Sequence, residues 1–422
     1  MRYGSGWIHS RLPVLCSSGL RSMVERIPAE AETQPYRELF PHCRDGVVYV
    51  DHAAVSPLPV PVVEAVERYV RRRHYGKPGL EWELERAARA RKLIADLIGA
   101  PSEATIALMP NTTTGLAAVA LALPWSSGES VLVGEWEFPA AVYPWRALQR
   151  FGVRLRLLPM PDGGLTAERV AEALDASVRV VVVSAVQFLS GYRVDLEELG
   201  QLCRQRGVLL VVDGMQAVGA VRLDVRRAQI AALACGGAKW LMAPHGSGFL
   251  YLAPELVERL TPGILGWLAA ENPWDFFAFE QPLAATARRF EGGSLDVGAI
   301  VGLCAALELL HTYGPDRAEQ RLRALSTYLW ERLRAEFPEL PLLTPAQAER
   351  RAGIVTLRVG SPERAAALVK ELAQRRIYCS ARLEYVRFSP HWYNTAAELE
   401  QLVAALRDIR AVRGWHMQGM AP

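Results

Sequence analysis

The stretch Gly207-Val208-Leu209-Leu210-Val211-Val212-Asp213 decides the fold, because an unbroken apolar run ends abruptly in a carboxylate. A run of this length and composition is typical of a parallel strand that is buried on both faces. Asp213 then lies at the carboxyl end of the strand, where open α/β sheets bind their ligands. The run therefore predicts an α/β domain with a ligand site beside Asp213.

A second apolar run, Leu233 to Leu241, contains Lys239. Lysine is scarce in this chain: only Lys77, Lys92, Lys239 and Lys370 occur, so 44 of the 48 basic residues are arginine. Arginine stays protonated, whereas a desolvated lysine can lose its proton and bond to an aldehyde. Lys239 is therefore a candidate for a reactive amine.

Asp213 and Lys239 together match what pyridoxal 5'-phosphate requires of a protein. The lysine forms a Schiff base with the cofactor, and an acid keeps the pyridine nitrogen protonated so that the ring withdraws electrons. Gln216 follows the acid by three residues, and two glycines lead into the lysine. Taken singly, Asp213 is explained by a turn and Lys239 by a side chain that extends to solvent, but the pair favours the cofactor.

Length and composition point to a globular protein of two domains. The chain has 422 residues, of which half are hydrophobic and 22% charged, and no apolar stretch reaches membrane-spanning length. A net charge of +3 is too small and too dispersed to predict a nucleic acid or an acidic membrane as partner. The six cysteines show no CxxC spacing, so we expect reduced thiols in a cytoplasmic protein.

Strands alternate with helices between residues 105 and 252, which predicts a mostly parallel, seven-stranded sheet covered on both faces. The expected strands are 105–109, 130–134, 153–158, 178–184, 208–212, 231–234 and 248–252. The residues 377–380 are expected to form one further strand. We expect a disordered tail over 1–30, a segment over 31–60 that packs on the small domain, a large cofactor-binding domain over 61–310, and a smaller α+β domain over 311–422.

The run Pro110-Asn111-Thr112-Thr113-Thr114 opens a helix directly after a strand. Hydroxyl groups, free backbone N–H groups and the positive end of the helix dipole converge there, so Thr112 and Thr113 are candidate phosphate ligands. Ordinary helix capping by Asn111 or Thr112 explains the same pattern in isolation. Gln187, which follows another strand, could donate to the phenolate oxygen of the cofactor.

At this point the chain resembles the class V aminotransferase family of fold-type I pyridoxal-phosphate enzymes, which includes cysteine desulfurases, kynureninases and isopenicillin N epimerase. The resemblance extends from about Val47 to Leu406. It rests on the order and spacing of six motifs, Tyr49-Val50-Asp51-His52-Ala53-Ala54, Asn111-Thr112-Thr113, Val212-Asp213-Gly214-Met215-Gln216, Gly237-Ala238-Lys239-Trp240-Leu241, Phe290-Glu291-Gly292-Gly293-Ser294 and Arg387-Phe388-Ser389-Pro390-His391-Trp392-Tyr393-Asn394-Thr395.

The resemblance implies a cofactor role for each matching residue. Lys239 would form the internal aldimine and later carry protons, and Asp213 would pair with the pyridinium nitrogen. The remaining residues would surround the ring and the phosphate: Phe138 stacked on the ring, Gln187 and Gln216 at the phenolate oxygen, and Thr112 and Thr113 at the phosphate.

For the substrate and for assembly, the resemblance implies four further roles. Arg387 would hold the substrate α-carboxylate, a task that suits a guanidinium. His52 is a candidate for side-chain specificity. Trp267 and Ser294 resemble positions that reach the phosphate from the neighbouring subunit, which implies a homodimer with shared sites.

Three departures from the family pattern bear on the reaction. Phe138 stands where cysteine desulfurases usually stack a histidine. Cys379 is the one cysteine near the position of their catalytic loop cysteine, and in a buried strand it is better explained as a small apolar residue. Gly236 and Ala238 replace residues that donate to the phosphate in many relatives, so we expect weaker binding of the cofactor.

These observations predict a pyridoxal-phosphate enzyme that acts on a small amino acid, as an aminotransferase or as a lyase that breaks a C–S bond by β-elimination. A reaction like that of cysteine desulfurases or selenocysteine lyases, or an epimerisation, is the alternative within the family. A non-catalytic homologue that binds the cofactor is the alternative outside it, although such a protein has no use for Arg387.

Overall fold

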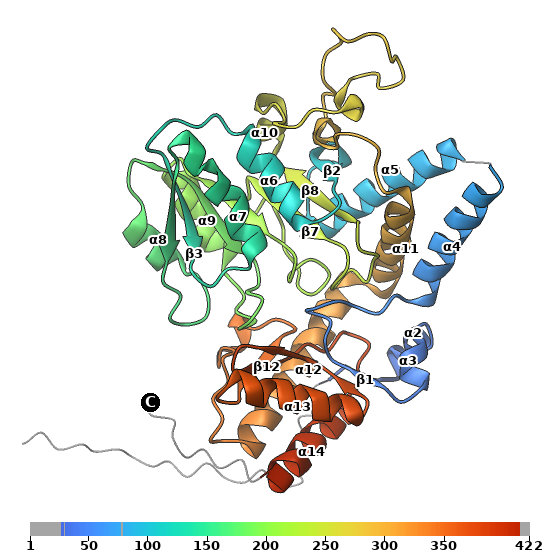
Figure 1. Cartoon of the computed structure of the whole chain (residues 1–422), viewed down its shortest axis with the longest axis vertical. Coiled ribbons are helices and arrows are strands. Elements are labelled where there is room, and N and C mark those ends of the chain that lie inside the picture. Colours follow the sequence, from blue (N-terminus) through green and yellow to red (C-terminus); the bar gives the residue numbers. More distant parts are fainter. Residues whose placement is uncertain (1–26, 29, 77–78, 414–422) are drawn as a thin grey trace, which may run out of the picture.

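The computed structural model describes residues 27–28, 30–76 and 79–413, and the tail predicted at 1–30 lies almost entirely outside them. Two bodies are visible, a larger one around the central sheet and a smaller one below it (Figure 1). The larger body contains the strands that lead to Asp213 and Lys239, and the smaller body contains the strand of Arg387.

A seven-stranded sheet in the order β2-β8-β7-β6-β5-β3-β4 forms the centre of the larger body. All neighbouring strands are parallel except where β8 pairs, since β8 is antiparallel to both β7 and β2. The strands are β2 (Ile106–Leu108), β3 (Ser130–Gly134), β4 (Arg154–Leu158), β5 (Val178–Ser184), β6 (Leu209–Asp213), β7 (Ala232–Gly236) and β8 (Gly248–Leu252). The predicted mostly parallel sheet is confirmed, with β7 two residues longer at its end because Gly236 still pairs with Gly248.

Each face of the sheet is covered by helices, and this explains the unbroken apolar runs. Along β5, Val181 and Val183 belong to one hydrophobic core, whereas Val180 and Val182 belong to the core on the opposite face. The covering helices are α4 (Val60–His74), α5 (Leu80–Ile98), α6 (Thr112–Ala122), α7 (Pro139–Arg146), α8 (Ala167–Ala173), α9 (Leu196–Gln205), α10 (Pro254–Arg259) and α11 (Val297–Tyr313).

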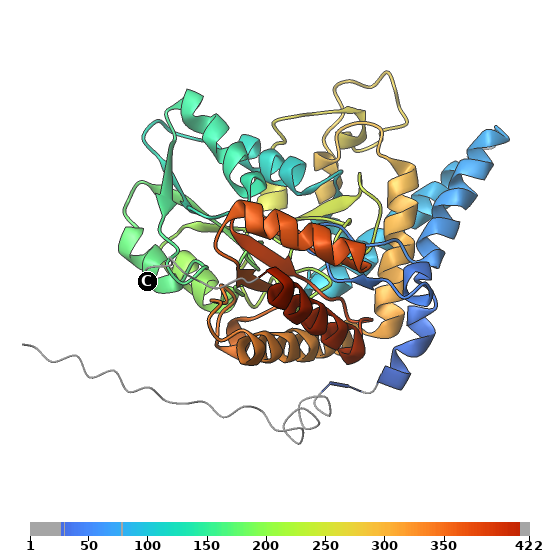
Figure 2. The same ribbon diagram turned by 60° about the horizontal axis from the view of Figure 1, so that its bottom comes forward.

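The smaller body is an antiparallel sheet with helices on one side. Its strands are β9 (Val355–Arg358), β11 (Ser380–Arg382) and β12 (Tyr385–Phe388), in the order β11-β12-β9. The helices α12 (Pro315–Glu336), α13 (Pro362–Gln374) and α14 (Ala396–Arg413) lie side by side over this sheet, and Figure 2 brings them forward.

The N-terminal segment joins the smaller body. Strand β1 (Val48–Tyr49) pairs in parallel with β10 (Ile377–Tyr378), and Val48 and Val50 are buried in the same hydrophobic cluster as Leu399 and Val403. Short helices precede and connect these elements, namely α2 (Gln34–Arg37), α3 (Pro41–Arg44), η1 (Glu30–Glu32), η2 (Glu103–Thr105), η3 (Ala147–Phe151), η4 (Trp267–Ala269), η5 (Ala287–Phe290) and η6 (Ala348–Arg350).

The single strand predicted over 377–380 is wrong. Residues Ile377–Tyr378 pair with β1, whereas the chain from Ser380 pairs with β12, so it changes partner at Cys379. The strand is therefore divided at Cys379. An apolar pattern in the sequence does not show which strand each residue pairs with, so it does not reveal this division.

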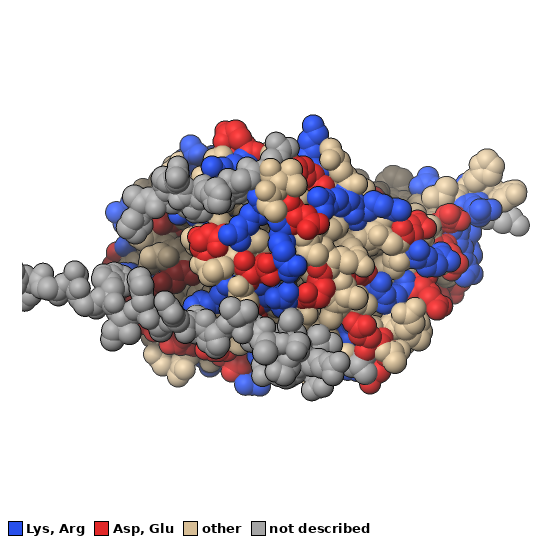
Figure 3. All heavy atoms as spheres, turned by 90° about the horizontal axis from the view of Figure 1, so that it is seen from below, with Lys and Arg blue, Asp and Glu red and all other residues tan. Residues whose placement is uncertain are grey.

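No single helix in the described ranges is long and apolar enough to span a membrane, although α11 and α12, bent by 79° at Gly314, pass that test as a pair by length and composition. Most of α11 is buried inside the molecule. On the face of the smaller body in Figure 3, basic and acidic side chains are interspersed.

Candidate active site

Asp213 and Lys239 lie at the carboxyl ends of two neighbouring parallel strands. Asp213 ends β6, and Lys239 follows the end of β7 by three residues. Burial raises the pKa of Asp213 to about 6, against the opposing effects of a hydrogen bond from Met215 N and of the charge on Lys239. Burial, and next the charge of Arg387, lower the pKa of Lys239 to about 8. Asp213 is thus a buried carboxylate whose ionised form a cationic partner would stabilise, and Lys239 is an amine that loses its proton more easily than an ordinary lysine.

Phe138 faces the amine of Lys239. Its ring centroid lies 5.5 Å from Lys239 Nζ, and the side chain is 44% exposed although it is a large apolar group. Phe138 is the N-cap of α7, so it stands at the start of the helix that follows β3. The ring is therefore held beside the amine with one side open, as a stacking residue requires.

The start of α6 offers hydrogen-bond donors for an anion, but only one of the two predicted threonine side chains is exposed there. Asn111 is the N-cap, and its Oδ1 accepts from Thr114 N at 2.9 Å. Thr112 is buried, and its Oγ1 accepts from Gly236 N at 3.0 Å, while Thr113 is exposed. The first backbone N–H groups of a helix have no intrahelical partner. We therefore assign the anion-binding capacity to these N–H groups and to the Thr113 hydroxyl.

The two predicted glutamines are held by internal hydrogen bonds. Gln216 Nε2 donates to Ala53 O at 2.9 Å, and its Oε1 accepts from Trp240 Nε1 at 2.8 Å. Gln187 Nε2 donates to Trp136 O at 2.6 Å, and its Oε1 accepts from backbone N–H groups of the next turn. Each amide nitrogen retains a second N–H that can serve a ligand oxygen.

Arg387, on β12, is buried and only partly satisfied. Its Nη1 donates to Phe188 O at 2.7 Å and its Nη2 to Ser380 Oγ at 3.3 Å, whereas its Nε has no hydrogen-bond partner in the described part of the protein. Burial lowers the pKa of Arg387 to about 10, which leaves it charged at neutral pH. A buried guanidinium with an unused donor is suited to bind a carboxylate.

Asp51 supports this arginine. The carboxylate lies 3.7 Å from Arg387 Nη2 and accepts a 2.7 Å hydrogen bond from Ser380 Oγ. The sequence placed Asp51 in a motif but gave it no role, because the contact joins residues that are 336 positions apart.

His52 does not line an open surface. It is fully buried, its Nδ1 lies 2.9 Å from Ser389 O, and its Nε2 lies 2.7 Å from Tyr393 Oη. Burial lowers its pKa well below the ordinary value, so the ring is neutral. The geometry places His52 behind the site, where it joins the N-terminal segment to the loop after β12, rather than in contact with a substrate.

Trp267 and Ser294 line a hollow that Lys239 does not line. Both are exposed and line a hollow of about 560 Å³ together with residues of α5, such as Leu84 and Ala87. The segment between α10 and η5 that carries Trp267 projects from the top of the larger body in Figure 1. Neither residue meets the other predicted site residues within one chain.

Cys379 is not positioned as a nucleophile. It is buried at the change of partner between β10 and β11, and burial raises the pKa of its thiol far above the ordinary value. A thiol of this kind stays protonated and unreactive at neutral pH.

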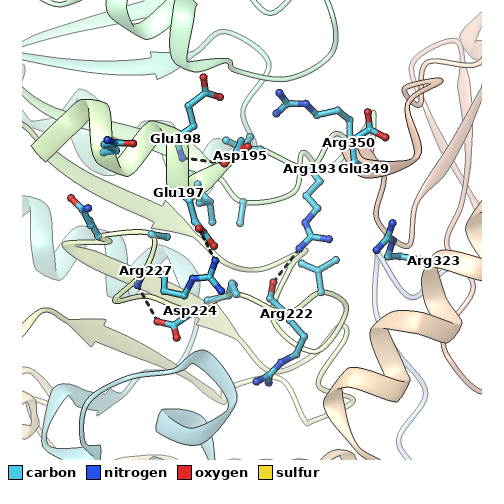
Figure 4. Close-up of a pocket in the computed structure, with 18 residues that line it drawn as sticks. Arg193, Asp195, Glu197, Glu198, Arg222, Asp224, Arg227, Arg323, Glu349 and Arg350 are labelled. Atoms are coloured by element: carbon cyan, nitrogen blue, oxygen red, sulfur yellow. Dashed lines mark hydrogen bonds and ion pairs between the residues drawn. The ribbon is translucent and has the colours of Figure 1, made fainter. Parts of the chain in front are cut away.

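A larger hollow of about 800 Å³ lies elsewhere, between α9 and the start of the smaller body, and none of the predicted site residues lines it (Figure 4). Several of its charged side chains are paired, such as Arg227 with Glu197 at 3.0 Å and Arg193 with Glu319 at 2.7 Å. We therefore place the chemistry at Lys239 and not in this hollow.

The model of one protein family, Aminotransferase class-V, matches residues 48–402. The chain belongs to this family.

Members of the class-V aminotransferase family with the same fold are similar to this chain over most of its length. The aminotransferase YcbU of Bacillus subtilis, itself uncharacterized, is 28% identical over 373 residues, which cover 88% of this chain and 96% of the relative. A probable cysteine desulfurase of Pyrococcus abyssi is 29% identical over 383 residues, covering 86% and 94%. The apo structure of a cysteine desulfurase from Thermococcus onnurineus NA1 has a TM-score of 0.80 at 27% identity, covering 92% and 98%.

A further solved relative, the cystine C–S lyase C-DES in complex with its product cysteine persulfide, has a TM-score of 0.78 at 26% identity, covering 86% of this chain and 97% of C-DES. In a mutant of C-DES, with a TM-score of 0.80 at 26% identity, glycine is covalently linked to the pyridoxal-phosphate cofactor. This class-V enzyme is accordingly a fold-type I, pyridoxal-phosphate-dependent enzyme.

The residues of the enzyme fit this cofactor. Asp213 is a buried acid available to a ring nitrogen, Lys239 is an amine of lowered pKa, and the start of α6 can receive a phosphate. Gly236 adds space, because a Cβ atom there would lie 3.2 Å from Met215 Sδ and 3.7 Å from Thr112 Oγ1. Asp213, Lys239, Gly236 and the start of α6 all lie at or after the carboxyl ends of strands of the same sheet.

One site residue, Glu137, escaped the sequence analysis. It is buried, its Oε1 accepts from Ser184 N at 2.8 Å, and its Oε2 is hydrogen-bonded to Ser184 Oγ. Because Ser184 pairs with Asp213 across β5 and β6, Glu137 ties the segment that carries Phe138 to the strand end beside Asp213. A glutamate between Trp136 and Phe138 carries no local signal of burial in the sequence, because glutamate is most often a surface residue.

Proposed function

We propose that this class-V enzyme cleaves a C–S bond in an α-amino acid by α,β-elimination, without a protein thiol as sulfur acceptor. The observation that supports the proposal most directly is the arrangement of Lys239, Asp213 and Arg387 around one site, with the nearby thiol of Cys379 buried and protonated. A desulfurase that passes sulfur to its own cysteine needs an exposed thiolate near the substrate.

Three residues divide the work. When bound, pyridoxal phosphate supplies an aldehyde for Lys239 and a ring that withdraws electrons from the substrate α-carbon. Asp213 favours a protonated ring nitrogen, because a buried carboxylate with a raised pKa gains most from a cationic neighbour. Lys239, with a pKa near 8, can take up a proton from the α-carbon and return it.

Arg387 orients the substrate. Its unused Nε donor and the neighbouring Nη group can bind an α-carboxylate at two points, which fixes the α-carbon relative to Lys239. Phe188 O holds the guanidinium at Nη1, and Ser380 and Asp51 hold it at Nη2.

The relatives support a reaction at sulfur. Cysteine desulfurases and a cystine C–S lyase are among the similar proteins, and the lyase is described in complex with a cysteine persulfide. Transamination is the second candidate, since YcbU carries an aminotransferase name. Epimerisation would use the same three residues.

Product analysis separates these reactions. The cofactor-loaded enzyme is incubated with cystine, cysteine and cysteine conjugates, and the products are identified. Pyruvate with ammonia and a sulfur product supports elimination, alanine with sulfane sulfur indicates a desulfurase, and a keto acid without ammonia indicates transamination. Lys239→Ala should lose turnover in each case, and a variant that retained it would contradict the proposed site.

We also propose a homodimer in which Trp267 and Ser294 complete the phosphate site of the other subunit. The segment around Trp267 exposes large apolar side chains, including Phe277 at 87% and Phe279 at 85%, as an interface requires. Trp267, Trp274 and Phe276 contact one another edge-on, which gives the segment a defined shape.

Sedimentation of the wild type and of Phe277→Asp tests this assembly. A dimer that dissociates on this substitution, with weaker cofactor binding, supports shared sites, whereas a monomeric wild type with tight cofactor binding contradicts them. The cytoplasmic location stays a prediction from the spacing of the cysteines in the sequence.

A further inference from the structure

Arg382 is the last residue of β11, and the register of the sheet places it beside Arg387. Ser380 lies opposite Arg387, and Arg382 lies opposite Tyr385, in the antiparallel pair β11–β12. Directly opposed residues share a face of a sheet, as do residues two apart on one strand. Ser380, Arg382 and Arg387 therefore share one face, and the two arginines are diagonal neighbours whose Cα atoms are roughly 7–8 Å apart.

That face is the one turned to the active site. Arg387 and Ser380 are linked there by a hydrogen bond, and Ser380 contacts Asp51. The charge of Arg382 acts on the same groups, since it lowers the pKa of both Arg387 and Lys239. Arg382 itself is half-buried.

The charge of Arg382 acts on Asp51, whose pKa it lowers, but no acid of the described residues lies within ion-pair distance of Arg382. Arg387 has Asp51 at 3.7 Å, but Arg382 forms no ion pair with any residue in the described ranges, and its Nη1 donates to the adjacent carbonyl of Ala381 at 2.7 Å. Two neighbouring guanidinium groups beside a lysine repel one another. A site keeps such an arrangement at a cost in stability, and an anionic ligand that contacts both guanidinium groups removes the repulsion.

We propose that Arg382 binds a second carboxylate, carried on the side chain of the substrate, so that the enzyme selects amino acids with an acidic side chain. The proposal rests on the proposed role of Arg387 as the clamp of the α-carboxylate. Arg382 is then a specificity residue, because it contacts the distal end of the substrate and not the reacting atoms.

The separation of the two arginines bears on the length of the substrate. Two carboxylates that are bound by two separate guanidinium groups need a spacer between them, and diacids of different length measure that spacer. Within the proposed C–S lyase reaction, the matching substrate is a cysteine thioether or disulfide whose far end carries a carboxylate.

Binding of unreactive acids tests the proposal without turnover. Glutarate and pentanoate have the same number of carbon atoms and differ in one carboxylate, and their affinity for the cofactor-loaded enzyme is measured by calorimetry. The variants are Arg382→Gln, Arg382→Lys and, as a matched change of charge on the exposed surface of α13, Arg364→Gln. Succinate and adipate extend the series in length, and circular dichroism checks that each variant is folded.

We expect glutarate to bind the wild type at least about tenfold more tightly than pentanoate, the value of one charge-assisted hydrogen bond. Arg382→Gln should remove this preference with less than about threefold change for pentanoate, Arg382→Lys should retain part of it, and Arg364→Gln all of it. Equal affinity of the wild type for the two acids overturns the proposal, as does an equal loss for both in Arg382→Gln, which would make Arg382 part of the α-carboxylate clamp.

A separate variant, Arg387→Gln, tests the proposed role of Arg387 in the function of the enzyme. Arg387→Gln should weaken both acids, because both need the α-carboxylate clamp. If Arg387→Gln left pentanoate unaffected, the clamp would be misassigned, whatever the outcome at Arg382.

Discussion

Glu137→Gln should make the enzyme more stable at alkaline pH than the wild type. Burial raises the pKa of Glu137 from 4.5 to about 7, against the hydrogen bonds from Ser184, and the charge of Asp213 adds to the rise. Glutamine has the same shape, can accept from Ser184 N and can donate to Ser184 Oγ. The substitution therefore removes the ionisation and keeps the contacts.

The sign follows from proton binding. Between pH 4.5 and about 7 the folded chain retains a proton on Glu137 that the unfolded chain has lost. Stability of the wild type consequently falls as the pH rises through this window and then stays lower. The linkage relation, with these two pKa values, gives the variant a gain in the free energy of unfolding, relative to the wild type, of about 2–3 kcal/mol between pH 5 and pH 8.

Urea unfolding of the cofactor-free protein at pH 5, 6, 7 and 8 measures this difference. The quantity of interest is the free energy of unfolding of the variant minus that of the wild type at each pH. Glu135→Gln is the matched control, because it makes the same chemical change at an exposed glutamate two residues earlier in the same segment. Parallel pH profiles for Glu137→Gln and the wild type would refute the reasoning, since they would mean that Glu137 is ionised in both states over the whole range.

Three further predictions concern the site. Asp51→Asn should raise KM about tenfold with little change in kcat, because Ser380 and Arg387 lose the carboxylate that orients the clamp; steady-state kinetics give the split, and a loss confined to kcat would contradict it. Cys379→Ala should retain activity within about threefold, and the native thiol should react slowly with Ellman's reagent because it is buried; an inactive but folded variant would reinstate a sulfur-carrying role. In the cofactor-free enzyme, the rate of acylation of Lys239 should reach its midpoint near pH 8, followed by mass spectrometry, and a midpoint near the ordinary lysine value would show that burial does not act on this amine.

The features that could be predicted from the sequence are those that produce a pattern within a short stretch of residues. The strand ending at Asp213 is an apolar run closed by a charged residue, and β6 has it within one residue of the expected bounds. Lys239 stands out because the chain uses so few lysines, and the helix start at Asn111 carries its own capping signal. Each of these can be recognised within about ten residues of sequence.

The missed features depend on which segments meet. Asp51 acquires its position only when β1 pairs with β10, and Glu137 only when its segment folds onto the end of β5. Arg382 is one of 44 arginines until the register of β11 and β12 places it beside Arg387. Register and long-range pairing are set by the packing of both bodies, so they cannot be read from local patterns in a single sequence.

The pairing of β1 with β10 also governs when the enzyme can first become active during its synthesis. Val48 leaves the ribosome more than 300 residues before its partner Ile377. At 5–20 residues per second the N-terminal strand waits roughly 15–65 s for its neighbour, while the large sheet can already fold. Asp51 and Arg387 meet only after that interval, so a nascent chain can acquire the lysine and the phosphate-binding helix start well before it can hold a substrate. Cofactor capture can therefore precede completion of the site, and substrate binding marks a finished chain.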